Sequence, residues 1–122
     1  MVLTISTITA VQSAVNTNLI TNFTYFGTGT GTTAATTSDT TLEAETYQSA
    51  VQESTNLTTS VIFSGFQNAL QNNSNAINEI GFKTGSAGTL RQRKVLETAN
   101  RITKDATKEV WLDLEITNSV TQ

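Results

Sequence analysis

The sequence predicts a mainly β protein, a small antiparallel β-sandwich or barrel of about five to seven strands with an N-terminal arm or short helix. Residues 110–117 alternate aliphatic and polar side chains, as half-buried strands do, and residues 57–66 repeat that alternation. Thr, a β-branched residue that favours strands, fills 25 of the 122 positions. We therefore expect an ordered, β-rich chain with a polar surface.

Uncharged polar residues dominate the composition. Together with Thr, the 11 Asn, 10 Ser and 7 Gln fill 53 positions, whereas no charged residue precedes Asp39. Disordered chains are usually rich in Pro, Lys and Glu, and this chain contains no Pro. Since hydrophobic residues make up 37% of the chain, the composition indicates an ordered domain.

The residue types that are missing exclude several classes of protein. Because the chain has no Cys and no His, it lacks the usual ligands of a zinc finger, and it has neither a thiol nucleophile nor a histidine base. We therefore expect no cofactor and no metal. A net charge of −3 gives no positive field for a nucleic acid backbone. The apolar runs are too short for a membrane span, and the first residues lack the basic start of a signal peptide.

The chain is expected to divide into an N-terminal interaction segment, residues 1–20, and a single β domain, residues 21–122. In the N-terminal segment, apolar residues recur at helical spacing from Ile8 to Leu19, whereas the Thr content and the lack of charge argue against a free-standing helix. A short helix and an extended arm packed on a neighbour both remain open. In either form, the apolar side chains are candidates for an interface: Ile5, Ile8, Val11 and Val15.

The β domain is expected to start with a strand over residues 19–26, with Phe23 and Tyr25 on one face. A run of Gly and Thr follows, in which Gly recurs at alternate positions and predicts a loop or a bent strand end. Residues 38–43 resemble the capped start of one helical turn. The residues expected to form structural turns are Gly27, Gly29, Gly31 and Asp39.

The remaining pattern predicts further strands separated by polar connections. The expected strands span residues 46–52, 57–66, 76–82, 89–96 and 110–117. The expected connections are a turn at 53–56, a polar loop at 67–75 and a glycine-rich hairpin connection at 83–88.

The motifs that carry chemistry in other proteins are weak here. The Gly-Thr run lacks the G-x-G-x-x-G spacing and the following Lys of a phosphate-binding loop, so a structural loop is the better explanation. Asp113 and Glu115 share a strand face, where a pair of acids can do acid–base work. Nothing else in the chain supports that role, and a solvated strand face explains the pair better.

Charge changes sign along the chain. Residues 39–82 carry five acidic residues and no basic one, whereas residues 83–122 carry seven basic and five acidic residues. Contact between subunits explains this better than contact with nucleic acid, because complementary patches orient copies of one chain. Ordinary solvated charge explains it equally well. The candidates for such an interface are Arg91, Arg93 and Arg101, together with Trp111, which lies opposite the aliphatic face of the last strand.

Three stretches carry a family resemblance. They are F-T-Y-F-G-T-G-T-G-T-T at 23–33 with S-D-T-T-L at 38–42, I-N-E-I-G-F at 77–82 with G-T-L at 88–90, and I-T-K at 102–104 before V-W at 110–111. In order and spacing over residues 22–117, the chain resembles small tailed-phage virion proteins, described as phage tail or tail-fibre proteins. One departure is Ala35, where that family often has Pro, and residues 1–20 match little.

The resemblance implies a structural component of the virion, made in the host cytoplasm, with a β fold and no catalytic residues. Its implied partners are copies of itself and neighbouring virion proteins in the tail, as a fibre, baseplate or neck attachment; neither nucleic acid nor membrane is expected. One alternative is a decoration protein on the capsid head. A second is a carbohydrate-binding module, in which Trp111, Tyr25 or Tyr47 holds a host-surface glycan.

Overall fold

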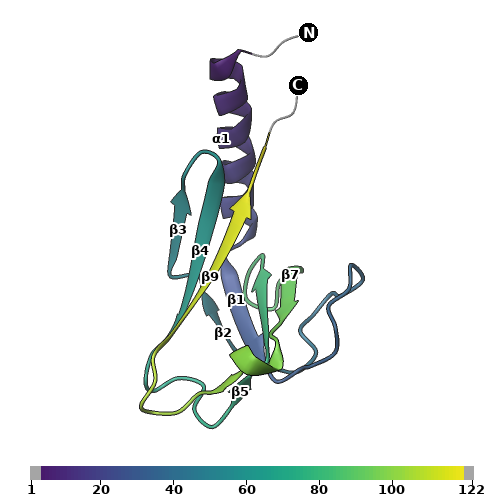
Figure 1. The fold of residues 1–122 in the computed structure, drawn as a ribbon, viewed down its shortest axis with the longest axis vertical. Helices are drawn as coiled ribbons and strands as arrows, with labels where there is room; N and C mark the ends of the chain where they lie inside the picture. Colours follow the sequence, from purple (N-terminus) through teal and green to yellow (C-terminus); the bar gives the residue numbers. More distant parts are fainter. Residues whose placement is uncertain (1–3, 120–122) are drawn as a thin grey trace.

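The computed structural model describes residues 4–119 of the chain. In this part, one α-helix, α1 (Ile5–Asn22), precedes nine strands that form three antiparallel sheets. The mainly β, antiparallel fold class is therefore confirmed, with a helix as the N-terminal element. The sheets of the described residues do not close into a barrel, and the arrangement is sandwich-like (Figure 1).

Two larger sheets enclose the core. The first has four strands in the order β2 (Glu45–Ala50), β1 (Tyr25–Gly29), β6 (Glu79–Lys83) and β7 (Leu90–Val95). The second has three strands in the order β3 (Glu53–Asn56), β4 (Ser60–Gln67) and β9 (Val110–Thr117). Shorter elements complete the described chain: β5 (Ala76–Ile77), the 3-10 helix η1 (Thr98–Asn100) and β8 (Ile102–Thr103).

Aromatic side chains from both sheets and from the end of the helix form the core. Phe63 of β4 is fully buried, and its ring centroid lies 5.0 Å from that of Phe23 and 6.3 Å from that of Phe82. Phe23 follows α1 directly, and Phe82 belongs to β6. The core therefore ties the C-terminal end of the helix to both sheets.

The strand expected over residues 19–26 is wrong in its first half, because α1 continues to Asn22. Within the helix, Thr21 Oγ1 donates to Thr17 O (3.0 Å) and Asn22 Nδ2 donates to Asn18 O (2.8 Å). These polar side chains thus find partners one turn earlier in the helix. Helical spacing also lets Leu19 pack against the core together with Phe23.

Gly27 and Gly29 do not form a loop, because β1 runs through them between β2 and β6. The alternative of a bulged strand end is confirmed at Gly29, the last residue of β1, where the register with β2 shifts. None of the described glycines has a positive φ, so close packing explains their presence. A Cβ on Gly29 would lie 2.5 Å from Glu79 Oε1 and would collide with the carbonyl oxygen of Ala44. Gly31, which is buried just beyond β1, is crowded in the same way by Glu43 and Glu79.

The crowding at Gly29 leads to a first prediction. Gly29→Ala should lower the free energy of unfolding by about 1–3 kcal/mol, because the added methyl group must displace backbone or a buried carboxylate. The matched control is Gly85→Ala, where an added Cβ meets nothing within 4 Å. Urea denaturation of both variants measures the difference, and equal stabilities would contradict the packing explanation.

Two expected turns differ in the structure. Residues 53–56 are not a turn but the strand β3, which pairs with β4 from Glu53↔Ser64 to Asn56↔Val61. The chain reverses at Thr58, which has φ 70° and whose N–H donates to Asn56 Oδ1 (3.0 Å). Residues 38–43 form no helical turn, because the Asp39 carboxylate accepts from Thr36 N–H instead (3.0 Å). Asp39 still lies in a turn, which its own N–H closes by donating to Thr36 O (3.2 Å).

The later strands follow the sequence pattern closely. β9 pairs with β4 along its full length and alternates as expected, with the aliphatic residues Leu112, Leu114 and Ile116 against the core. β7 returns beside β6 after the glycine-rich connection. The strand expected over residues 76–82 divides into β5 and β6 on either side of Asn78.

Candidate functional site

The middle of α1 buries polar residues and exposes apolar ones, whereas Leu19 and Ile20 near its C-terminal end pack against the core, as a surface helix usually does. Its buried residues are Gln12 and Asn16, whereas Ile5 is 83% exposed, Val11 43% and Val15 42%. The N-terminal turns of α1 extend beyond the ends of the strands (Figure 1). The whole helix also lacks charged residues. It therefore presents an uncharged, partly apolar surface.

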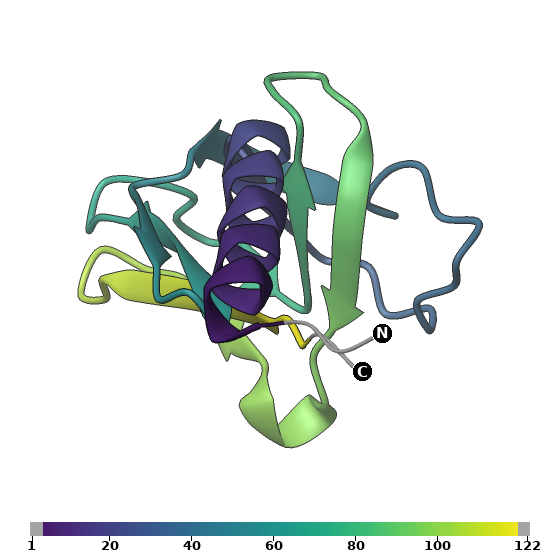
Figure 2. The ribbon, with the colours of Figure 1, turned by 90° about the horizontal axis from the view of Figure 1, so that it is seen from above.

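A buried amide cluster fixes the orientation of this helix. Asn16 Nδ2 donates to Asn56 Oδ1 (2.9 Å), Thr58 O (3.0 Å) and Ser60 O (3.2 Å), at the turn between β3 and β4. Asn118, just beyond β9, donates in turn to Asn16 Oδ1. Because these hydrogen bonds hold one face of α1 on the sandwich, the flank with Val11 and Val15 must face outward. Figure 2 shows α1 lying across one end of the sandwich.

A groove of about 380 Å³ lies along the exposed flank of α1. Its lining is almost entirely apolar: Val11, Ala14, Val15, Asn18 and Leu19. Because these apolar side chains adjoin one another along one flank of the helix, this flank is a candidate for protein–protein contact. Of the predicted interface residues, Val11 and Val15 line the groove, Ile8 is half-buried on the same helix, and Ile5 is exposed near its N-terminal end.

Arg93 was a candidate for an interface, but its side chain is only 4% exposed and binds partners within the chain. Its Nε donates to Glu79 Oε2 (2.8 Å), its Nη1 to Asp39 Oδ2 (2.8 Å) and its Nη2 to Thr33 O (2.9 Å). Glu79 is fully buried and also accepts from the N–H groups of three loop residues: Gly31, Glu43 and Ala44. This network closes the long loop after β1 onto β6 and β7.

The two carboxyls of this network are held in their charged form. Burial alone raises the pKa of Glu79, but the hydrogen bonds from Ala44 N–H and Arg93 outweigh burial and lower the pKa below its usual 4.5. The pKa of Asp39 lies below its usual 3.8 because Thr36 N–H and Arg93 donate to the carboxylate. Both groups therefore bind protons more weakly in the folded chain than in the unfolded chain.

Lowered carboxyl pKa values predict the direction of the pH dependence. The stabilisation from Glu79 and Asp39 is present above their unfolded pKa values and is lost as pH falls through the folded ones. The free energy of unfolding should thus fall below about pH 5 and stay nearly constant from about pH 6 to 8, where a chain without His has few groups to titrate. Urea denaturation at a series of pH values measures this, and stability that rises on acidification would contradict it.

The change of charge sign along the sequence has an explanation within one chain. Three of the four ion pairs among the described residues join the acidic middle to the basic later part: Glu45–Lys83, Asp39–Arg93 and Glu79–Arg93. The fourth, Asp105–Lys108, is local. The complementary charges therefore pair within one chain, and this pairing explains the change of sign without a subunit interface.

The other interface candidates are not gathered around one feature. Arg91 is exposed, whereas Arg101 is half-buried and its Nε donates to Leu96 O (3.0 Å). Trp111 is 56% exposed on the outer face of β9 and its ring centroid lies 4.6 Å from that of Phe66. Tyr25 and Tyr47 belong to the other sheet, and Tyr47 packs on Phe26. The three aromatic residues thus do not form a common platform for a sugar ring.

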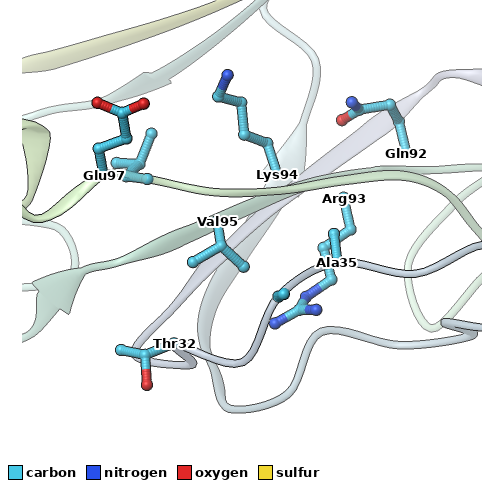
Figure 3. A pocket seen from close by; sticks show the side chains of 9 residues that line it. Thr32, Ala35, Gln92, Arg93, Lys94, Val95 and Glu97 are labelled. Carbon is cyan, nitrogen blue, oxygen red and sulfur yellow. The ribbon is translucent and has the colours of Figure 1, made fainter.

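A second cavity, of about 520 Å³, lies between β7 and the loop after β1 (Figure 3). Arg93 extends from β7 toward Ala35 of the loop, whereas Gln92 and Lys94 point away from it (Figure 3). Because Glu79 and Asp39 already bind the Arg93 guanidinium, the cavity lacks the converging polar groups of a catalytic site. Among residues 4–119, no cluster of His, Cys, Asp or Glu is placed to hold a metal ion, and no helix is long and apolar enough to cross a membrane.

The uncharged flank of α1 is therefore the best candidate for a functional surface in the described part of the chain. Comparison of the chain with protein-family models, curated proteins and solved structures finds no match.

Proposed function

We propose that this chain is a non-enzymatic structural module of a tailed-virus particle, which assembles in the tail with its own copies and with neighbouring virion proteins. The observation that carries the proposal is the flank of α1, an uncharged apolar surface that residues 4–119 leave partly exposed. Apolar surface held outward by buried hydrogen bonds suits a protein that is covered in its assembly.

The residues that carry the family resemblance support a structural role. Gly31 and Asp39 from the first motif and Glu79 from the second meet in the buried network around Arg93. All four polar contacts of the Glu79 carboxylate are to donors within the chain, which leaves this acid no capacity to act on a substrate. The shared motif thus explains a stable scaffold, on which α1 is displayed.

The experiment is to find the chain in the particle. Particles purified from producing cells should contain the chain in a fixed ratio to the major tail protein, as measured by quantitative mass spectrometry. Antibody labelling observed by electron microscopy should then place it on the tail. Labelling of the head would favour the alternative role in capsid decoration, and absence from purified particles would contradict the proposal.

Deleting residues 1–18 would be a poor test of assembly, because it would remove Asn16 and with it the buried amide cluster. Substitutions on the exposed flank of α1 leave that cluster intact. They are the better means of separating assembly from folding.

Exposure of Trp111 favours glycan binding as a second candidate function. Its stack on Phe66 presents a flat aromatic surface of the kind on which sugar rings pack. Glycan-array binding that is lost in Trp111→Ala would support it, whereas an array without binding would exclude it for the glycans present.

A further inference from the structure

We infer that the occupant of the exposed flank of α1 is α1 of other copies of this chain, packed in parallel as a three-helix bundle with cyclic symmetry. The contact residues, which we call the helix seam, are Ile8, Val11, Val15 and Asn18. The inference rests on the proposed function in that it names the partner of the same surface.

The spacing of the helix seam is the first argument. Its members are three, four and three residues apart, which is the heptad spacing that aligns side chains along a helix that packs on another. Asn22, the last residue of α1, falls four residues further on the same line. A helix that only covers its own sandwich needs apolar residues on the inner face, and α1 has Gln12 and Asn16 there.

Charge is the second argument. A partner that placed charged groups against α1 would bury them without counterions, because the helix has no charge to offer. The covering surface must therefore be uncharged and apolar as well. The exposed flank of α1 is itself such a surface, and a second copy of α1 meets it without repulsion although each chain carries a net charge of −3.

The position of α1 is the third argument. The N-terminal turns of α1 extend beyond the strands (Figure 1), so this part of the helix is accessible to other copies. Cyclic symmetry requires equivalent helices to run parallel around the axis, with the sandwiches at one end. The Asn16 hydrogen bonds hold each helix in a fixed orientation, which lowers the entropy cost of assembly.

The residue types along the helix seam favour more than two chains. β-branched residues at both core positions of a heptad favour three or more helices over two, and three is the smallest such number. Ile8, Val11 and Val15 are all β-branched. Asn18 and Asn22 are polar residues in line with them, and polar residues in such a seam fix register at some cost in stability.

The experiment is the solution mass of the full chain, measured by sedimentation equilibrium over a wide range of concentration. We expect a species of three chains of 13.1 kDa each, which dissociates on dilution. Val15→Lys should shift the mass to one chain, because the ammonium would be buried without a partner. The matched control is Thr17→Lys, which adds the same charge at an exposed position on the opposite flank of α1.

Both variants should keep the circular dichroism spectrum of the wild type, since neither residue is buried. A monomeric or dimeric wild type, a trimeric Val15→Lys variant, or equal dissociation of both variants would overturn the inference. The proposed function is tested separately. A trimer in solution that is absent from purified particles would support the bundle and contradict the virion role. A monomer in solution that is present in particles would support the virion role and contradict the bundle.

Discussion

Replacing Glu79 by Gln should lower the free energy of unfolding by about 3–5 kcal/mol, the cost of breaking a buried ion pair by removing one partner. The Glu79 carboxylate accepts from three backbone N–H groups and from Arg93 Nε. A Gln side chain has one oxygen and one NH₂ group, so two of these donors would face a donor. The Arg93 guanidinium would also lose one of its two carboxylates.

Urea denaturation at neutral pH measures this loss. The matched control is Glu43→Gln, because Glu43 is exposed on the same loop and its carboxylate accepts from Thr32 N–H (3.1 Å). Because solvent screens an exposed carboxylate, Glu43→Gln should stay close to the wild type in stability. If Glu79→Gln and Glu43→Gln had the same stability, the buried network would not be what closes the loop after β1.

Asn16→Leu is the second large effect that we expect. The substitution makes α1 more apolar, yet it should lower the free energy of unfolding by about 2–4 kcal/mol, because Leu cannot replace the hydrogen bonds that Asn16 makes at a fully buried position. Thr58 O, Ser60 O and Asn56 Oδ1 each keep one other donor, whereas Asn118 Nδ2 loses its bond to Asn16 Oδ1.

Ser13→Leu provides the control for Asn16→Leu, because it makes the same kind of change at an exposed position of α1. Its stability should lie close to that of the wild type. A result in which Asn16→Leu is as stable as Ser13→Leu would show that the helix is not held by its polar face.

The later half of the fold could be predicted because its side chains alternate without interruption. In β9, Leu112 and Leu114 face the core while Asp113 and Glu115 face solvent, so the pattern alone identifies a half-buried strand. The first half could not be predicted in the same way. β1 contains Gly27 and Gly29, which local rules assign to loops. Glycine is required there only by packing from elsewhere in the chain, of Glu45 and Leu42 on Gly27 and of Ala44 and Glu79 on Gly29.

The apolar residues of α1 could be identified from the sequence, but which face of the helix packs on the sandwich could not. The helical spacing from Ile8 to Leu19 suggests an inner face, whereas Asn16 and Gln12 occupy that face in the structure. The partners of Asn16 lie about 40 to 100 residues later, a separation that periodicity cannot detect. The sequence does contain one indication of the buried network. Glu79 is an acidic residue among the largely apolar residues 77–82, and such a residue must be either exposed or paired.

The most direct test of the account uses a single Cys on the helix seam, in a chain that otherwise has none. In a parallel bundle, residue 11 of each copy lies near the symmetry axis, within reach of a disulfide to its equivalent. Under mild oxidation, Val11→Cys should give covalent dimers on a denaturing gel, whereas Ser13→Cys, on the opposite flank of α1, should stay monomeric. Equal cross-linking of the two variants, or none in Val11→Cys, would contradict the claim that copies of this chain assemble through α1.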